Sequence, residues 1–245
     1  MTAQKFIAKL VSRRKLARDT FEVIFKVIKP IDFTYKVGNF ASIRVDDGKI
    51  PLVFRAYTFA SVPNKNGSFK LIVKLFCDKE GNKGRGSGFL QSLEINKTVE
   101  FFGPAGTENF TPRGAINEPL LLLGTGTGIA PLVATAEKLT TEKSPRPIKL
   151  FLGVSFIEDV FYREEFEQLK KANPNFNFLI AISRPPRGYV GITGRLPTIL
   201  EKEKNLKNSE AFICGSITSV AGIKTKLLEL GLSKDKIDAE GFGEN

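Results

Sequence analysis

The chain has 245 residues, of which 42% are hydrophobic and 26% are charged, and this composition excludes disordered and fibrous proteins. Its 37 basic and 26 acidic residues give a formal net charge of +11. That charge indicates either general solubility or an acidic partner such as nucleic acid, an anionic cofactor or an acidic protein.

The side chains available for chemistry are limited. The chain contains no histidine, which excludes Ser-His-Asp and Cys-His catalysis and histidine-ligated zinc or haem. Its two cysteines, Cys77 and Cys214, are too few for a disulfide framework or a protein-held iron–sulfur cluster. We therefore expect no metal site and no cluster, and chemistry that depends either on a borrowed cofactor or on carboxylates, hydroxyls, thiols, lysine and arginine.

The longest apolar runs, residues 120–123 and 178–182, are far shorter than the roughly 20 residues that span a bilayer. The N-terminus shows no secretory pattern. These features predict a cytoplasmic protein without a membrane span.

The first half of the chain has the sequence pattern of short strands separated by turns. Apolar residues alternate or cluster in four candidate strands, at residues 21–27, 40–45, 69–76 and 99–102. Asp47-Gly48 and Asn66-Gly67 are turn signals, and one helical stretch lies near residues 88–93. The pattern predicts a small antiparallel β-barrel.

From Glu118 onward, strands and helices alternate. The expected strands are residues 120–123, 148–154, 178–182 and 211–214, and the expected helices are residues 130–142, 164–172 and 220–230. This alternation predicts an α/β doubly wound parallel sheet. We place the domain boundary near residues 111–114, which gives domains 1–113 and 114–245.

The most informative motif is the glycine-rich turn with Gly124, Gly126 and Gly128 between a strand and a helix. Glycines let backbone amides approach a ligand, and the start of the helix favours a diphosphate. The spacing is neither G-x-G-x-x-G nor a P-loop. The alternative interpretation is a tight strand-to-helix connection with no ligand.

Two further motifs lie in the first half. Alternation puts Arg55 and Tyr57 on one face of a strand, where the ring can stack on a heterocycle while the guanidinium binds phosphate. Gly86 and Ser87 expose amides that suit an anion. The alternatives are an ordinary strand with a cross-strand tyrosine, and a hairpin loop.

Taken together and in order, these motifs resemble the ferredoxin–NADP reductase family of flavoproteins along nearly the whole chain. The matching segments are residues 55–58, 73–74 with 86–87, 103–106, 123–131, 150–155 with 162–166, and 214–215. The resemblance implies an FAD-binding barrel followed by an NADP-binding α/β domain.

The resemblance also implies roles in the flavin site. Arg55 would bind the FAD diphosphate, Tyr57 would stack on the isoalloxazine, and Thr58 would hydrogen-bond near flavin N5. The remaining flavin-binding positions would be Ala56, Ile72, Val73, Lys74, Arg85, Gly86 and Ser87.

In the second domain, the resemblance assigns the nicotinamide ribose and diphosphate to the glycine-rich turn, and the nicotinamide C4 to Cys214. Ser183 and Arg184 would hold the 2′-phosphate, which favours NADP and leaves NAD possible, with Arg187 or Arg195 in place of a missing lysine. An alternative for Cys214 is a buried small apolar residue. The full set of nucleotide positions is Gly126, Thr127, Gly128, Val154, Ser155, Ser183, Arg184, Cys214 and Gly215.

The C-terminus carries two more candidates. Glu240 resembles the family's late glutamate near the site of hydride transfer, and Phe242 would cover the flavin. The alternative is a frayed polar tail. The expected catalytic residues are then Tyr57, Thr58, Cys214 and Glu240.

The resemblance implies an oxidoreductase that moves hydride between NADPH and FAD and single electrons to or from a small acidic carrier such as ferredoxin or flavodoxin. Residues 13–18 and Lys74 are candidates for the contact with that carrier, or simply solvated surface. The alternatives are the NAD(P)H-dependent reductase component of an oxygenase, a free flavin or quinone reductase, and a flavin-binding regulatory subunit. A nucleic-acid-binding module, which we do not expect, would bind no flavin.

Overall fold

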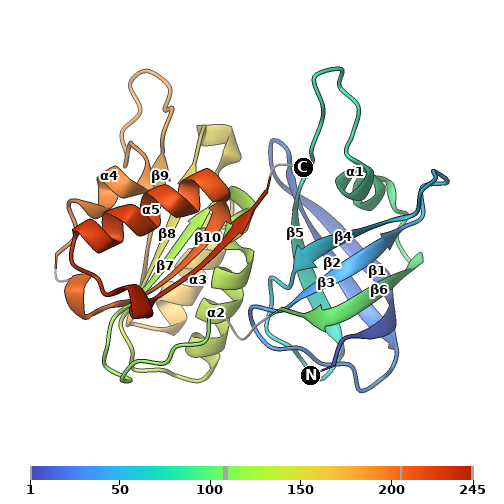
Figure 1. Cartoon of the computed structure of the whole chain (residues 1–245), viewed down its shortest axis with the longest axis horizontal. Coiled ribbons are helices and arrows are strands. Elements are labelled where there is room, and N and C mark those ends of the chain that lie inside the picture. The colour runs from blue at the N-terminus through green and yellow to red at the C-terminus, as the bar shows by residue number, and fades with distance from the viewer. Residues whose placement is uncertain (1, 107–109, 205, 244–245) are drawn as a thin grey trace. The chain divides into compact units, whose positions relative to one another are not determined.

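The computed structural model describes residues 2–106, 110–204 and 206–243. The chain divides into two compact units, Met1–Glu108 and Asn109–Asn245, coloured from blue to green and from green to red in Figure 1. The sequence places the division slightly later, between residues 113 and 114.

The first unit is a six-stranded antiparallel half-barrel in the order β4-β3-β6-β1-β2-β5, which confirms the predicted barrel domain. The strands are β1 (Gln4–Ala17), β2 (Thr20–Lys29), β3 (Phe40–Val45), β4 (Val53–Thr58), β5 (Ser68–Lys74) and β6 (Thr98–Ala105). One helix, α1 (Arg85–Ser92), connects β5 to β6.

Alternation of buried and half-buried residues builds this unit, as in β3, where Ala41, Ile43 and Val45 face inward. Its core is rich in phenylalanine. The ring of Phe6 stacks on Phe101 with centroids 5.1 Å apart, in a cluster of buried side chains from β1, β2, β5 and β6. Each buried ring removes a large apolar surface from water, so this cluster holds the half-barrel together.

The second unit is a five-stranded parallel sheet in the order β11-β10-β7-β8-β9, which confirms the predicted doubly wound fold. The strands are β7 (Leu120–Thr125), β8 (Ile148–Val154), β9 (Phe176–Ile182), β10 (Glu210–Ser216) and β11 (Ile237–Phe242). The helices are α2 (Ala130–Thr141), α3 (Arg163–Ala172), α4 (Leu196–Leu200) and α5 (Ile217–Glu229), with short 3-10 turns η1 (Gly126–Ile129), η2 (Ile157–Asp159), η3 (Leu206–Asn208) and η4 (Lys234–Lys236).

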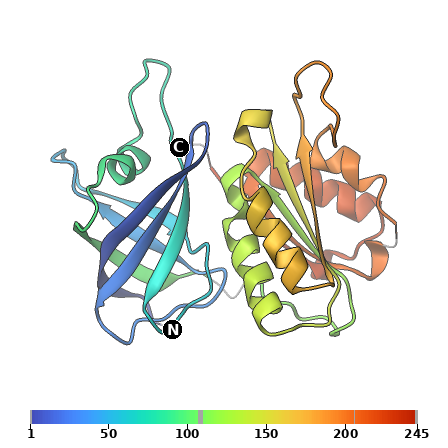
Figure 2. The same cartoon turned by 180° about the vertical axis from the view of Figure 1, so that it is seen from behind.

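Helices cover both faces of this sheet. The α4 and α5 helices lie over the face seen in Figure 1, and α2 and α3 lie over the opposite face, seen in Figure 2. The chain builds β7, β8 and β9 toward one edge and then returns to β10 on the other side of β7. This reversal puts the topological switch point between β7 and β10, where open α/β sheets bind ligands at the carboxyl ends of the strands.

Within the described residues, no helix combines the length and apolar character needed to cross a membrane. The same residues contain no cluster of three or more cysteine, aspartate or glutamate side chains suited to a metal ion.

Candidate functional site

The first part of the site lies on β4, at the edge of the half-barrel. Arg55 and Tyr57 share one face of the strand, as predicted, and pair with Ile43 and Ala41 of β3. The strand is fixed at its end by Phe59, a fully buried residue whose ring stacks on Tyr35 with centroids 3.9 Å apart. The packing after the motif therefore holds the arginine and the tyrosine in place.

The start of α1 lies directly against these two side chains. A methyl group at Gly86 would come within 2.6 Å of Cγ of Arg55 and 2.9 Å of the hydroxyl oxygen of Tyr57. Only glycine leaves both side chains undisturbed at this distance. The fold thus brings together two motifs that were predicted separately from the sequence.

The first turn of α1 offers backbone donors at the same place. The helix begins after Gly84, and no side chain caps its amides. Such amides are suited to a diphosphate, and the positive end of the helix dipole favours it. Among the described residues, no carboxylate pairs with Arg55, whose guanidinium donates only to the carbonyl of Phe54 (3.0 Å). These donors, with the adjoining ring, fit the diphosphate and flavin of FAD.

Burial also changes the pKa of the Tyr57 phenol. Desolvation raises the pKa of Tyr57 to about 12, against a smaller lowering effect of the Arg55 charge. The phenol is therefore neutral at physiological pH. A neutral ring beside a guanidinium can stack on a planar heterocycle without an added negative charge.

The side chain of Arg85 has several partners within the first unit. Its guanidinium forms two hydrogen bonds of 2.7 Å with the carboxylate of Asp47 and also donates to the carbonyls of Lys49 and Pro51. The hydrogen bonds from Arg85 hold the pKa of Asp47 well below its usual range. These contacts tie α1 to the loop between β3 and β4.

The other expected flavin positions differ in their surroundings. Val73 belongs to the apolar core, whereas Lys74 is exposed. Ile72 is buried outside that core. The hydroxyl of Ser87 accepts a hydrogen bond from the amide of Phe76 (3.1 Å), which fixes the loop before the helix.

On β4, Ala56 is exposed and Thr58 is half-buried. By strand alternation, both lie on the face opposite Arg55 and Tyr57.

The second part of the site lies at the switch point of the parallel sheet. Gly126 has a φ of +51°, a left-handed conformation that lets β7 turn directly into η1. A methyl group at Gly128 would lie 2.5 Å from the carbonyl oxygen of Cys214 and from Cα of Gly215. Neither η1 nor α2 has a side-chain cap, so the amides of residues 126–128 are suited to a diphosphate.

The end of β10 is packed just as tightly. A methyl group at Gly215 would overlap the hydroxyl oxygen of Thr125. Thr125 was not among the residues predicted from the sequence. The sequence signal that could have identified Thr125 is its position immediately before Gly126 of the glycine-rich turn.

Cys214 and Glu240 are cross-strand partners in β10 and β11. Cys214 is fully buried, and its pKa is raised by desolvation and, to a lesser extent, by the charge of Glu240. Glu240 is half-buried, and burial raises its pKa as well. The thiol is therefore protonated at neutral pH, and the carboxyl group keeps its proton to a higher pH than an exposed glutamate does.

Phe242 ends β11 opposite Ser216 and is half-buried. The alternative of a frayed tail is wrong for residues 237–242, which form a paired strand. Residues 244 and 245 lie outside the described part of the chain.

The remaining nucleotide positions follow β8 and β9. The amide of Ser183 donates to the carbonyl of Val154 (3.0 Å), and the amide of Arg184 donates to that of Ser155 (2.8 Å), which continues the strand pairing. The guanidinium of Arg184 lies 5.6 Å from the ring centre of Phe156. An exposed arginine held over a ring in this way is available to a phosphate.

One cavity of the first unit lies beside α1. It has a volume of about 930 Å³ and is lined by parts of α1, β3 and β6, and Arg85 is the one predicted site residue on its wall.

Three of the basic residues at 13–18 have partners within the first unit. Arg13 donates to the carbonyl of Leu93 (2.8 Å) at the end of α1, Arg14 pairs with Glu22, and Arg18 lies near Asp19. Arg13 thereby satisfies a helix-end carbonyl.

Residues 7–110 match the family described as the oxidoreductase FAD-binding domain, and residues 122–224 match the oxidoreductase NAD-binding domain. One component of the Na(+)-translocating NADH-quinone reductase of Methylococcus capsulatus is 31% identical over 209 residues, which cover 80% of this chain and 50% of that protein. The chain thus spans about half the length of the curated relatives it matches.

Two solved structures are similar over most of the chain. The Amycolatopsis cytochrome P450 reductase GcoB has a TM-score of 0.86 at 22% identity and covers 98% of this chain and 70% of its own. The ferredoxin-NADP+ reductase of Plasmodium falciparum with 2′P-AMP has a TM-score of 0.79 at 23% identity, with coverage of 98% and 97%. At these identities the likeness is one of fold.

Proposed function

Because this chain belongs to the ferredoxin–NADP reductase family of FAD- and NAD-binding oxidoreductases, we propose that it takes electrons from a reduced nicotinamide dinucleotide and passes them to a separate electron carrier. The observation that carries the proposal is the packing of Gly86 against Arg55 and Tyr57, which presents a ring, a guanidinium and free helix amides together. Bound FAD would supply the change from two-electron to one-electron chemistry.

In this proposal the residues of the chain bind and orient FAD and the nicotinamide dinucleotide. Arg55 and the first amides of α1 hold the diphosphate of FAD, and Tyr57 covers one face of the flavin ring. In the second unit, the turn at residues 126–128 holds the nucleotide diphosphate. Cys214, at the end of β10 next to that turn, would lie beside the nicotinamide as an uncharged thiol, and its side chain is fully buried in this structure. Glu240 pairs with Cys214 across β10 and β11, and burial raises the pKa of its carboxyl group, which is therefore suited to hold or release a proton.

Arg184 supports NADPH as the preferred electron donor. Its guanidinium is exposed and, among the described residues, pairs with no carboxylate. An arginine of this kind is suited to the 2′-phosphate that distinguishes NADPH from NADH. The second candidate is NADH, which the name of the Methylococcus relative favours. Steady-state kinetics with both nucleotides separates the two.

The positive charge of the chain supports a small acidic carrier, such as a ferredoxin or a flavodoxin, as the electron acceptor. Opposite charges accelerate encounter and are screened by salt. The rate of electron transfer to an acidic ferredoxin should therefore fall as ionic strength rises. A rate independent of salt, or faster reduction of a neutral quinone, would assign the chain to the oxygenase or quinone reductases instead.

The flavin part of the proposal is tested with Tyr57→Ala. The purified variant should retain less FAD than the wild type, because a stacked aromatic pair contributes about 0.5–1.5 kcal/mol beyond area burial. Tyr57→Phe is the matched control and should retain FAD, because it keeps the ring. Equal retention by Tyr57→Ala and the wild type would count against the stacking role.

A further inference from the structure

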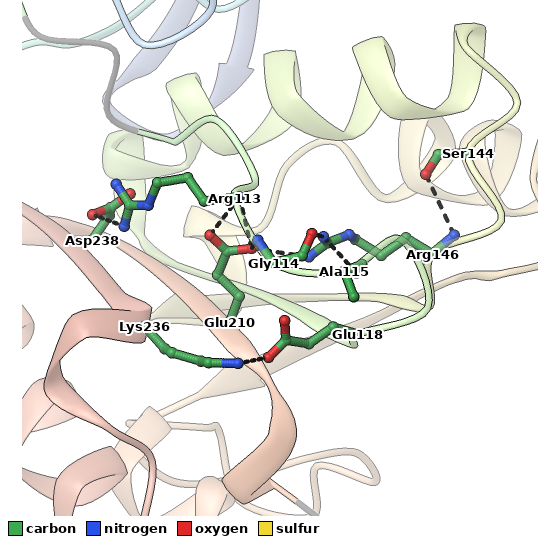
Figure 3. Close-up of polar contacts among 9 residues, drawn as sticks. All are labelled: Arg113, Gly114, Ala115, Glu118, Ser144, Arg146, Glu210, Lys236 and Asp238. Atoms are coloured by element: carbon green, nitrogen blue, oxygen red, sulfur yellow. Dashed lines mark hydrogen bonds and ion pairs between the residues drawn. The ribbon is translucent and has the colours of Figure 1, made fainter.

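Residues 110–115 begin the described part of the second unit. A polar cluster at the amino ends of the parallel strands holds residues 113–115 of this segment (Figure 3). The carboxylate of Glu210, at the start of β10, accepts hydrogen bonds from the amides of Arg113 (3.0 Å) and Gly114 (3.2 Å). The guanidinium of Arg146 pairs with the same carboxylate (2.9 Å) and donates to the carbonyls of Gly114 and Ala115.

The same segment is held on β11 and on α2. The guanidinium of Arg113 pairs with Asp238 at 2.8 Å. The ring of Phe110 is buried against Phe212 of β10, with centroids 5.7 Å apart, and its carbonyl accepts from the hydroxyl of Thr135 in α2 (3.3 Å). Phe110 adopts this position with a φ of +64°, which is strained for a bulky residue.

The strand register connects these contacts to the candidate site. Phe212 pairs with Asp238, and two residues further along each strand Cys214 pairs with Glu240. Residues two apart on a strand share a face. Phe212 and Asp238 therefore lie on the same face as Cys214 and Glu240, about 7 Å from them along the strands. The segment thus touches both strands that carry Cys214 and Glu240.

Stability alone does not explain this arrangement. The side chains of Arg146 and Glu210 are only 4% and 3% exposed, and a buried ion pair is often no more stable than apolar side chains of the same volume. A buried ion pair can instead fix one defined geometry, because any other arrangement of the two side chains leaves a buried charge without a partner. The strained backbone of Phe110 also indicates one defined geometry, because the surrounding contacts must hold Phe110 in that conformation.

We propose that residues 110–115, through Phe110 and Arg113, are positioning residues that fix the carboxyl ends of β10 and β11 for the reaction of the nicotinamide. This inference rests on the proposed function. Phe110 contacts Phe212, and Arg113 contacts Glu210 and Asp238, so we expect both to act through these residues rather than by touching nucleotide or flavin. Loosening the segment should therefore slow flavin reduction more than it weakens nucleotide binding.

The first test needs no cofactor. The chain has two cysteines, so Cys77→Ser leaves Cys214 as the one thiol. In that background, Arg113→Ala and Phe110→Leu should each accelerate labelling of Cys214 by a small maleimide by about tenfold, because local opening becomes easier. The matched control is Glu203→Gln, which breaks the Lys149–Glu203 ion pair elsewhere in the same unit and should leave the labelling rate unchanged.

The second test uses FAD-loaded protein in stopped-flow. Arg113→Ala should lower the limiting rate of flavin reduction about tenfold, with the dissociation constant of the nucleotide within about twofold of the wild type. Arg113→Lys keeps the charge near Asp238 and should restore most of the rate. Unchanged labelling in both variants, or equal effects in Glu203→Gln, would overturn the inference. A wild-type protein that no nucleotide reduces would overturn the proposed function, while the labelling result still decides the effect on the strands.

Discussion

Gly86 lies so close to Arg55 that a methyl group on it would come within 2.6 Å of Cγ of the arginine. Gly86→Ala should therefore displace Arg55 and Tyr57 and raise the dissociation constant of FAD at least about tenfold, as overpacking of a tight site does. Titration of the FAD-free protein with FAD measures this. Gly222→Ala, in α5, is the control, because its nearest contact would be an ordinary 3.8 Å from Pro197.

Arg55 and Arg85 are both arginines of the flavin motifs, but their side chains have different partners. Arg55→Ala should weaken FAD binding about tenfold or more, because a charge-assisted hydrogen bond contributes about 1.5–3 kcal/mol. Arg85→Ala should mainly lower the melting temperature, because it releases Asp47 and the loop after β3. If Arg85→Ala lost FAD as strongly as Arg55→Ala at an unchanged melting temperature, the structural role of Arg85 would be wrong.

Gly128 packs against the end of β10. A side chain at this position would meet backbone atoms of Cys214 and Gly215, which cannot rotate away. Gly128→Ala should cost about 1–3 kcal/mol of unfolding free energy and weaken nucleotide binding. Gly222→Ala should instead stabilise α5 by about 0.5–1 kcal/mol. Chemical denaturation of both variants gives the comparison, and a Gly128→Ala protein as stable as the wild type would contradict the packing.

The preference between NADPH and NADH depends on Arg184 if the proposed function is right. Arg184→Ala should raise KM for NADPH about tenfold or more, the loss expected for a charged hydrogen bond, and change KM for NADH by less than about twofold. Arg187→Ala tests the other arginine of the same loop. If only Arg187→Ala raised KM for NADPH, the 2′-phosphate contact would belong to Arg187. Equal increases of KM for NADPH and NADH would show that neither arginine contacts the 2′-phosphate.

The raised pKa of Glu240 has a consequence for stability. Below the ordinary glutamate pKa of about 4.3 the carboxyl is neutral in both folded and unfolded states, so Glu240 adds no pH dependence there. As pH rises from that value through the raised folded pKa, the unfolded state loses its proton first, and the folded state becomes less stable by up to about 1.4 kcal/mol per pH unit. Glu240→Gln should therefore gain stability relative to the wild type as pH rises through this range.

Denaturation curves of the wild type and Glu240→Gln from pH 4 to 8 measure the difference. A difference that stays constant with pH, or one that changes with the opposite sign, would show that burial does not raise the pKa of Glu240.

Local patterns predicted most of the elements. The alternation in residues 40–45 and the apolar run in residues 148–154 correspond to β3 and β8 because each is a short strand with a clear buried face. Beyond the eight expected strands, β4 was anticipated only as the strand of the Arg55–Tyr57 motif, and β1 and β11 were missed. Charged residues such as Arg13 and Arg14 interrupt the apolar pattern of β1, and β11 is polar and is a strand through its pairing with β10.

The candidate site was only partly predictable for the same reason. Arg55, Tyr57 and Gly86 could each be selected by motif, but their contact is made by the fold. The partner of Arg85 lies 38 residues away at Asp47, which no local pattern reveals. Likewise, the contacts of Phe110 and Arg113 are to strands about 100 residues later, so spacing carries no information about them.

The central claim is that this chain binds FAD and reduces it with a nicotinamide dinucleotide. The most direct test is the visible absorption spectrum of the purified protein, supplied with FAD where needed, before and after anaerobic addition of NADPH and, separately, NADH. We expect a flavin spectrum that bleaches, and more rapidly with NADPH. A protein that takes up no FAD, or one whose flavin spectrum persists with both nucleotides, would contradict the claim.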